Sequence, residues 1–279
     1  MVEVPSQKII IALDGSLVAN NAADVAIEIA QAESLLIEGL YIVDEPLVFD
    51  PYANYSRELG SDRKVNSRSQ LIDLFETIGL ETLTGLEVKC KSKGVAVTTN
   101  MYLGNVPDLI LENAKGAFFL ALGRRGNSHV NDIDYLGEYF RQIVHHTPVP
   151  LILGGDLVRP IKQIFLIYDG SKEANRALKW ARYLRESLSA RMSIGLAESD
   201  EREIDLALLN TQFSEENLAV DDILHLEHRS INGIVDSINH SQADIVVMGG
   251  YRRSEFVAWF AGSPVDQIIR QISLPILIA

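Results

Sequence analysis

Two stretches of the chain show the same succession of apolar and polar positions. Residues 8–20 and 162–175 each begin with an unbroken apolar run and continue through Asp-Gly-Ser into a helical pattern, at residues 22–31 and 174–188. Apolar runs without alternation are typical of strands that are buried on both faces of a parallel sheet. The pattern therefore predicts a strand, a turn and a helix, repeated once.

The two turns match residue by residue. Asp14-Gly-Ser16 and Asp169-Gly-Ser171 are each followed, at equal spacing, by an alanine and an asparagine. Five identities in one register rarely arise by chance, so the two stretches indicate an internal repeat. An aspartate and a serine at a strand–helix junction favour a turn and a helix N-cap first, and a nucleotide contact second.

The repeat continues to the end of each copy. Apolar strands are predicted at residues 118–123 and 244–249, each running into a glycine. Closing strands are predicted at residues 149–153 and 274–278, each entered through a proline. Because proline is tolerated at the first residue of a strand or at an unpaired edge, both copies are expected to close in the same way.

The first copy is longer than the second. The distance between the copies is 155 positions at the Asp-Gly-Ser turns and 125 at the closing prolines, so about 30 extra residues lie in the first copy. They follow a second strand predicted at residues 35–43. Residues 44–69 are rich in Asp, Pro, Tyr, Ser and Arg, which predicts a long surface loop before a helix at residues 70–93.

The second copy has a strand predicted at residues 191–197 and a shorter helix at residues 204–219. Between the copies, the segment 154–160 contains two glycines and a proline, which predicts a linker. We therefore expect one domain at residues 1–155 and another at residues 160–279.

Strands that alternate with helices predict an α/β fold, in which each domain has a five-stranded parallel sheet with helices on both faces. In such doubly wound sheets, ligands lie beyond the carboxyl ends of the strands, where the strand order reverses. Asp14, Gly123, Asp169 and Gly249 all follow strand ends, so they are expected at that location.

Composition narrows the classes of function. The 279 residues are 47% hydrophobic, which is enough for an ordinary core in both domains. The chain has 38 acidic and 25 basic residues, and its net charge of -13 disfavours nucleic acid and membrane surfaces as partners. A single cysteine, Cys90, the lack of a signal-peptide pattern and the lack of an apolar run of roughly 20 residues favour a cytoplasmic protein.

The segment that begins at Gly249 has the most informative chemistry. Gly249 leaves a strand, and Gly262-Ser263 begins a helix that extends to about residue 272. Backbone amides at a helix N-terminus, a serine hydroxyl and a glycine that permits close approach are what a phosphate group requires. The alternative is that Ser263 only caps this helix, with Pro264 in its first turn.

These motifs resemble the universal stress protein family. The shared features are Asp-Gly-Ser after the first strand, a late Gly-x2-Gly-x9-Gly-Ser/Thr loop and a final strand with a proline. The doubled arrangement resembles the tandem-domain members, and the resemblance covers the chain except for residues 44–69. It implies two Rossmann-like domains of the adenine-nucleotide α-hydrolase type that form an intramolecular pseudo-dimer, in which the apolar closing strands cover each other's edges.

In ATP-binding members of that family, the aspartate and the end of the second strand hold adenosine, and the late loop holds the phosphates. The resemblance implies these contact residues in the second domain: Asp169, Gly170, Ala197, Gly249, Arg252, Gly262, Ser263, Pro264 and Val265. Arg252 stands where the family pattern has its second glycine. Its guanidinium either obstructs the loop or pairs with phosphate.

The first domain departs further from the family pattern. Its corresponding residues are Asp14, Val43, Gly123, Gly126 and Gly137. Ten residues rather than nine separate Gly126 from Gly137, and Glu138 replaces the Ser/Thr. Because a carboxylate at a helix N-terminus repels phosphate, this site is expected to be weak or empty. Arg124 and Arg125 either offset that charge in part or are simply exposed and solvated.

Motifs of catalysis and metal binding are missing from the sequence. It contains no Gly-x-Ser-x-Gly, His-Glu-x-x-His or Walker-A pattern, so no catalytic residue is predicted. The histidines include the neighbours His145 and His146, whose side chains diverge, and no metal site is predicted.

Two classes of function stay open. The first is a stress-response sensor or regulator that binds ATP, ADP or AMP, with magnesium accompanying ATP, chiefly in the second domain; it hydrolyses ATP slowly at most. The second is a scaffold of the same fold that binds no nucleotide, motivated by Arg252 and Glu138. A pyrophosphatase or ligase of the wider adenine-binding group is disfavoured because its loop motifs are missing. A homodimer is expected, and no regulatory partner protein is indicated.

Overall fold

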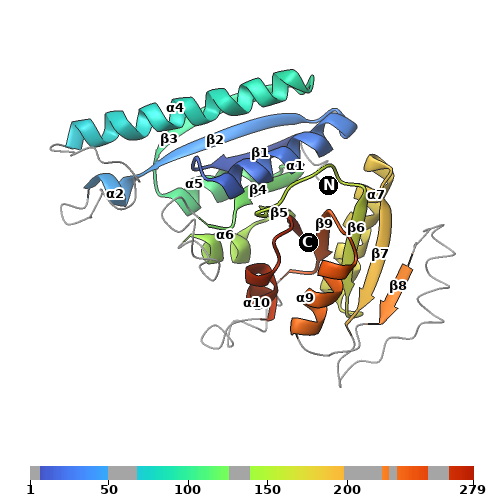
Figure 1. The fold of residues 1–279 in the computed structure, drawn as a ribbon. Helices are drawn as coiled ribbons and strands as arrows, with labels where there is room; N and C mark the ends of the chain where they lie inside the picture. Colours follow the sequence, from blue (N-terminus) through green and yellow to red (C-terminus); the bar gives the residue numbers. More distant parts are fainter. Residues whose placement is uncertain (1–6, 50–67, 126–138, 198–221, 226–230, 251–263) are drawn as a thin grey trace. The chain divides into compact units, whose positions relative to one another are not determined.

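The apolar runs of the sequence form the central strands of two parallel sheets. The computed structural model describes residues 7–49, 68–125, 139–197, 222–225, 231–250 and 264–279. The chain divides into two compact units, Met1–Asp156 and Leu157–Ala279. Each unit has a sheet and helices of its own (Figure 1).

The described elements of the first unit are strands joined by helices. They are β1 (Lys8–Leu13), α1 (Leu17–Glu33), β2 (Leu36–Asp44), α2 (Glu45–Phe49), α4 (Arg68–Ser92), β3 (Val97–Gly104), α5 (Val106–Asn113), β4 (Phe119–Gly123), α6 (Phe140–His146) and β5 (Leu151–Gly154). The strand order is β3-β2-β1-β4-β5, and every neighbouring pair is parallel. The order therefore reverses between β1 and β4.

The second unit repeats this topology. Its described elements are β6 (Gln163–Tyr168), α7 (Lys172–Leu188), β7 (Arg191–Leu196), β8 (Asp222–His225), α9 (Ile231–His240), β9 (Ile245–Met248), α10 (Pro264–Gln271) and β10 (Ile276–Ile278). The order is β8-β7-β6-β9-β10, again with parallel pairs throughout. The prediction of an α/β fold with parallel sheets is confirmed.

The central strands are buried on both faces. Ile9, Ile10 and Ile11 are consecutive in β1 and have no exposed surface, and all residues of β6 are buried. Consecutive side chains of a strand point to opposite faces, so both faces of these strands are covered. Helix α1 packs on β4 and β5, α4 packs on β2 and β3, and α7 packs on β6 and β9.

The helices that follow the Asp-Gly-Ser turns begin earlier than the sequence pattern predicts. They start at Leu17 and Lys172, immediately after an N-cap serine in each case. Capping sets the start, whereas apolar periodicity shows only where the helix begins to pack. Both helices are also followed by a serine C-cap in the left-handed conformation, Ser34 and Ser189, with φ of 54° and 52°.

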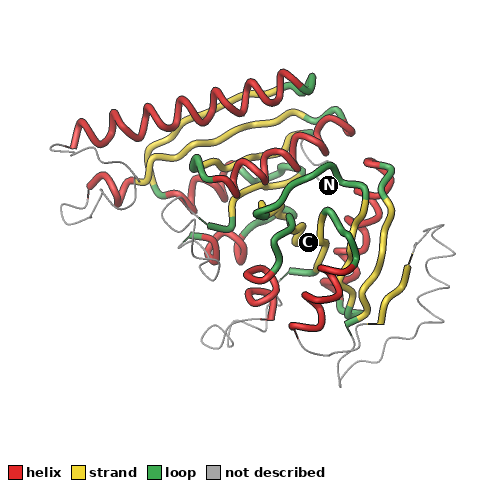
Figure 2. The backbone as a smooth tube through the Cα atoms, in the orientation of Figure 1, coloured by secondary structure: helices red, strands yellow, loops and turns green. Residues whose placement is uncertain are grey.

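The extra residues of the first unit are only partly a loop. β2 continues to Asp44, and α2 follows it at once, so the expected loop over residues 44–69 begins with a helix. Residues 50–67 and the helix predicted at 204–219 lie outside the described residues. The predicted helix at 70–93 is confirmed as α4, which runs along β2 and β3 (Figure 2).

The closing prolines enter their strands as predicted. Pro150 precedes β5, and its carbonyl accepts a hydrogen bond from the Leu120 amide at 3.0 Å. The carbonyl of Pro275 accepts one from the Val246 amide at the same distance. Since proline lacks a donor but keeps its acceptor, it fits at the start of a parallel strand without loss of a bond.

Gly154, the last residue of β5, allows the backbone of α1 to lie very close to the strand. A Cβ atom at this position would lie 1.7 Å from the Val18 carbonyl oxygen and 2.8 Å from the Ala22 amide nitrogen. Both contacts are with backbone, which cannot move away as a flexible side chain can. The packing of α1 on β5 therefore requires glycine here.

Gly154→Ala is expected to lower the free energy of unfolding of the first unit by about 1–3 kcal/mol or more, because α1 must shift from the sheet. The matched control is Gly85→Ala on α4, where a Cβ would meet nothing within 4 Å. That substitution should stabilise the helix by up to about 1 kcal/mol. Urea unfolding of the full chain, followed by circular dichroism, measures both. Equal midpoints for G154A and the wild type would contradict the contact.

Candidate functional site

Asp169 and Ser171 form the turn that starts α7. The Asp169 carboxylate accepts a hydrogen bond from the Ser171 amide at 2.9 Å. Gly170 between them has a φ of 71°, which glycine adopts without steric cost. Ser171 Oγ accepts a hydrogen bond from the Ala174 amide at 3.0 Å and so caps the helix. Each residue of the motif thus has a structural role.

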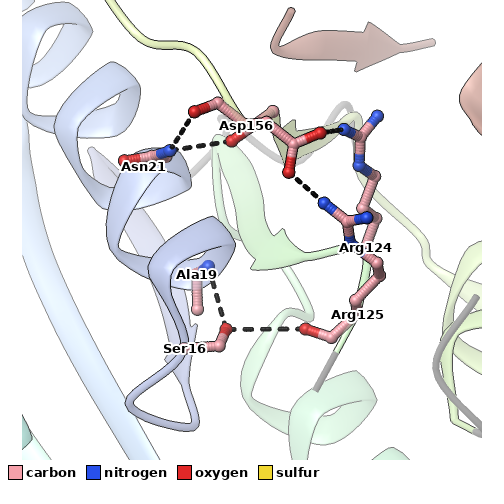
Figure 3. Close-up of polar contacts among 7 residues, drawn as sticks. Ser16, Ala19, Asn21, Arg124, Arg125 and Asp156 are labelled. Carbon is pink, nitrogen blue, oxygen red and sulfur yellow. Dashed lines mark hydrogen bonds and ion pairs between the residues drawn. The ribbon is translucent and has the colours of Figure 1, made fainter. Parts of the chain in front are cut away.

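The first unit has the same turn. Asp14 accepts a hydrogen bond from the Ser16 amide at 2.8 Å, and Gly15 has a φ of 81°. Ser16 Oγ accepts one from the Ala19 amide at 3.2 Å (Figure 3). The turn and the N-cap that the sequence favours are therefore confirmed in both units. A nucleotide contact of either aspartate stays a prediction.

Three of the predicted contact residues lie at one edge of the second sheet. β6 lies between β7 and β9, and Asp169, Ala197 and Gly249 follow the carboxyl ends of these three parallel strands. The Ala197 amide donates to the Tyr168 carbonyl at 2.8 Å, which keeps the ends of β6 and β7 level. Parallel pairing therefore brings these residues together where the strand order reverses, the usual location of ligands in such sheets.

Gly249 and Gly123 are both needed for packing within their own units. A Cβ at Gly249 would lie 2.8 Å from the backbone carbonyl carbon of Glu173. One at Gly123 would lie 2.9 Å from the amide nitrogen of Ala19. Each strand end therefore abuts the first turn of the helix that follows Asp-Gly-Ser. Helix packing is a sufficient reason for these glycines, and their contact with a ligand stays a prediction.

Part of the predicted site lies outside the described residues. This applies to Arg252, Gly262 and Ser263 in the second unit and to Gly126, Gly137 and Glu138 in the first. The late loops of both units, which the resemblance assigns to phosphate, thus stay predictions.

The described residues next to these loops add two observations. Pro264 is the first residue of α10, and Val265 is half-buried. Sequence reasoning overlooks Asp266, which lies in the first turn of α10 and is buried. Its acidic character at a predicted helix start is a recognisable signal, because a carboxylate there interacts with the helix dipole.

Val43 is buried in β2, so only its backbone is able to contact a ligand.

A buried tyrosine lies near each site aspartate. Burial raises the pKa of Tyr41 to about 12, and the charge of Asp14 adds to this effect. Burial and then the charge of Asp169 raise the pKa of Tyr168, whose hydroxyl donates to Asn175 Oδ1 at 3.0 Å. Both phenols are therefore neutral at neutral pH. Burial raises the pKa of Asp14 as well, and the hydrogen bond from Ser16 opposes this rise.

Arg124 and Arg125 follow β4 and are buried, which corrects the expectation that they are exposed and solvated. Their side chains are only 3% and 4% exposed. Arg124 Nη2 donates to Asp156 Oδ2 and Arg125 Nη2 donates to Asp156 Oδ1, so one carboxylate bridges two guanidinium groups (Figure 3). An arginine is buried at tolerable cost only with such a partner. Because Asp156 lies in the expected linker, the sequence does not reveal the pairing.

The chain around Asp156 is attached to α1. Asn21 is buried, and its side-chain amide donates to the Gly155 carbonyl at 2.8 Å and to the Asp156 carbonyl at 3.4 Å. On the other side, Ser16 Oγ lies 3.5 Å from the Arg125 carbonyl oxygen. The backbones on both sides of the ion pairs are thus held against the start of α1.

The pKa of Arg124 reflects its burial and the charges of the groups beside it. Burial lowers the pKa of Arg124, Asp156 raises it and Arg125 lowers it again, but arginine stays protonated in proteins. Two positive groups therefore share one carboxylate. Nε and Nη1 of Arg125 are both buried, and no described atom accepts a hydrogen bond from either.

Comparison with known proteins identifies the fold. The model of the universal stress protein family matches residues 5–153. The chain belongs to the universal stress protein family. Universal stress protein Slr1230 from Synechocystis sp. is 23% identical over 172 residues, and this match spans 60% of the chain and 60% of that curated relative.

Two solved structures extend the likeness over nearly the whole chain. A universal stress protein from Archaeoglobus fulgidus DSM 4304 is 17% identical, covers 98% of this chain and 96% of its own, and has a TM-score of 0.70. A protein from Pseudomonas aeruginosa UCBPP-PA14 is 14% identical, with coverage of 98% and 92% and a TM-score of 0.65. At these identities, the likeness shows the fold alone.

In the part of this universal stress protein that the structure describes, no three His, Cys, Asp or Glu side chains form a group able to hold a metal ion. His146, at the end of α6, has its Nδ1 atom 2.7 Å from the Gln142 carbonyl oxygen of its own helix. None of the described helices combines the length and apolar character that crossing a membrane requires.

Asp156→Asn is expected to lower the free energy of unfolding of this universal stress protein by about 1–3 kcal/mol, because two buried guanidiniums lose their carboxylate. Asp24→Asn is the matched control, since Asp24 pairs with Lys89 and the two side chains are 38% and 39% exposed. Removal of that pair should cost about 0–1 kcal/mol. Urea unfolding monitored by circular dichroism compares them, and equal losses would contradict the assigned role of Asp156.

Proposed function

We propose that this member of the universal stress protein family binds an adenine nucleotide, ATP, ADP or AMP, in its second unit. It would act in the cytoplasm as a stress-response sensor or regulator. The observation that supports this most is the convergence of Asp169, Ala197 and Gly249 at the carboxyl ends of three adjacent parallel strands. In doubly wound sheets, that edge is where nucleotides bind.

The chemistry of these residues suits the nucleoside part. Asp169 is half-buried at this edge, and its carboxylate, which accepts a hydrogen bond from the Ser171 amide, belongs to the acceptor class that suits nucleoside N–H or O–H donors. The end of β7 at Ala197 offers backbone groups beside it. This fits the roles that the family resemblance implies for the aspartate and for the second strand.

The phosphates are assigned to the late loop of the second unit. Gly262, Ser263 and the first amides of α10, which begins at Pro264, would hold them, and Arg252 would add positive charge. Magnesium would accompany ATP through its phosphates. We assign no catalytic residue, and hydrolysis would be slow at most, because no general base stands out in the sequence.

The first unit is proposed to bind nucleotide weakly or not at all. Its turn at Asp14 has the same geometry as the turn at Asp169. However, it has glutamate at position 138 in place of the Ser/Thr of the family pattern, and Asp156 already occupies the guanidiniums of Arg124 and Arg125. The two units would therefore differ in binding although they share a fold.

Titration of ATP into the full chain by isothermal calorimetry tests the proposal. Asp169→Ala should weaken binding by about ten-fold or more, because a hydrogen bond to a charged group is lost. Gly262→Asp should weaken it as well, through charge repulsion at the phosphates. Asp14→Ala is the matched control, since Asp14 forms the same turn in the first unit, and it should leave the affinity unchanged.

The outcome that would contradict the proposal is no binding heat above background for the wild-type chain. Equal losses for D14A and D169A would instead indicate that the second unit is not the preferred site. Mass spectrometry of protein purified under native conditions adds an independent readout, because AMP, ADP or ATP that copurifies is incompatible with a chain that binds no nucleotide.

A scaffold that binds no nucleotide is the second candidate function. The buried Asp266 favours it, because a carboxylate in the first turn of α10 is stabilised by the helix dipole and repels a phosphate there. Arg252 and Glu138, which depart from the family pattern, favour it too. In this case, the surfaces of the two units would bind a protein partner.

We also propose that the two units are tandem universal stress domains, covering residues 1–155 and 160–279, that form an intramolecular pseudo-dimer. The closing strands β5 and β10 are short and apolar, so their edges need cover. Association of two chains into a homodimer is expected in addition. Light scattering at micromolar concentration measures the mass, and a strict monomer would contradict the homodimer.

A further inference from the structure

Helix α4 is apolar on two sides, and only one of them packs on the sheet. Leu83 and Leu86 are buried next to Gly39 of β2. On the outer side of the helix, Leu80 and Val88 are 65% and 62% exposed. Figure 1 shows that α4 lies along β2 at the outside of the first unit. The outer side therefore presents two large apolar side chains to solvent.

These two side chains belong to one uncharged row, which we call the outer stripe and which consists of Thr77, Leu80, Thr84 and Val88. All four residues are exposed. They are three or four positions apart, and side chains at this spacing are neighbours on one face of a helix. Single exposed apolar residues are common, but a row of uncharged residues along an exposed helix face is typical of a contact surface.

Charge is distributed unevenly along the same helix. Asp73, Glu76 and Glu81 are exposed and precede the midpoint of the outer stripe or lie close to it, whereas Lys91 is exposed in the last turn and Lys93 directly follows the helix. Acidic residues interact with the dipole of their own helix only within its first turn. Glu76 and Glu81 lie beyond that turn, so the dipole does not account for this order.

Lys91 lies at the basic end and is available for a second partner. Its ammonium pairs with Glu87 at 3.1 Å, and its side chain is still 69% exposed. An ammonium has three N–H donors, so Lys91 is able to bind another carboxylate in addition to that of Glu87.

An antiparallel pair of α4 helices from two chains satisfies both patterns at once. With a two-fold axis at Thr84, each residue faces the residue of the second copy that is equally far from Thr84 in the other direction. Leu80 then lies against Val88 of the second copy. Glu76 comes beside Lys91 of the second copy, and the symmetry forms each contact twice. A parallel pair would instead place acid beside acid and base beside base, which is destabilising.

We propose that the outer stripe of α4 is the surface through which two copies of this chain associate, with their α4 helices antiparallel and the two-fold axis at Thr84. This inference rests on the homodimer proposed above and names its contact. The surface is separate from the closing strands β5 and β10, which are assigned to the contact between the two units of one chain. It does not depend on nucleotide binding.

Leu80→Lys in the full chain tests the apolar part of the contact. We expect L80K to raise the dissociation constant of the dimer by about ten-fold or more, because two lysines would face an apolar partner surface. Leu17→Lys is the matched control, since Leu17 is 60% exposed at the start of α1, and it should leave the dimer unchanged. Sedimentation velocity over a range of micromolar concentrations measures both, and circular dichroism verifies the fold.

A charge swap tests the antiparallel arrangement. Glu76→Lys and Lys91→Glu should each weaken the dimer at low ionic strength, because each brings like charges together. The double variant E76K/K91E restores opposite charges across the interface and should recover the wild-type association. If these charges acted only on the dipole of their own helix, the double variant would be the weakest of the three.

Disulfide crosslinking locates the two-fold axis. Thr84→Cys should form a crosslinked dimer on oxidation with copper phenanthroline, because residue 84 faces its own copy. Ser92→Cys is the control, since eight residues from the axis place it about 24 Å from its own copy along the helix. The native Cys90 is fully buried, and burial raises its pKa to about 11, so it does not compete.

The outcomes separate this inference from the homodimer itself. A wild-type chain that stays strictly monomeric would overturn both. A dimer that L80K and the charge variants leave intact would overturn the α4 contact alone and indicate another surface, such as the edge of β3. Equal crosslinking of T84C and S92C would indicate parallel helices and overturn the antiparallel arrangement.

Discussion

Parallel pairing of the strands within each unit is the constraint on which the rest of that unit depends. Because all strands run in one direction, each must be followed by a crossover, and all strand ends meet at one edge. The first helix of each unit begins at this edge, directly after Asp-Gly-Ser. That is why Asp169, Ala197 and Gly249, which are far apart in sequence, follow adjacent strands.

The same edge is also where the helix must pack closely. Gly123 and Gly154 lie at the ends of β4 and β5, and a side chain at either would meet the backbone of α1. Gly249 has the same relation to α7. Glycines at strand ends in this fold are therefore required by helix packing before any ligand is considered. Glycines in a family motif are therefore explained by helix packing as well as by ligand binding.

The two units use this edge differently. In the second unit, the described residues at the edge include Asp169, Ala197 and Gly249. In the first, two arginines are buried there and share the carboxylate of Asp156. Burial of two positive charges is costly unless an anion accompanies them, so this part of the first unit depends on an anion. In the structure, that anion comes from the end of the unit's own chain.

The sequence by itself determined the elements and the turns. Unbroken apolar runs, N-cap serines and the prolines before β5 and β10 act through neighbouring residues, so local pattern is sufficient to predict them. It also placed Asp169 and Gly249 at strand ends. Two helix starts differed, because a capping residue sets them, and the helix α2 stands where a loop was predicted.

Only the tertiary structure decided that Arg124 and Arg125 are buried and paired with a carboxylate. Their carboxylate is more than 30 positions away in the chain, at Asp156, and no local pattern links the two places. The burial of Asp266 and the packing role of Gly123 are of the same kind. Such contacts form only when the sheet order brings distant strand ends together. The residue that then lies nearby decides whether a buried charge has a partner and whether a helix is able to pack closely against the strand end.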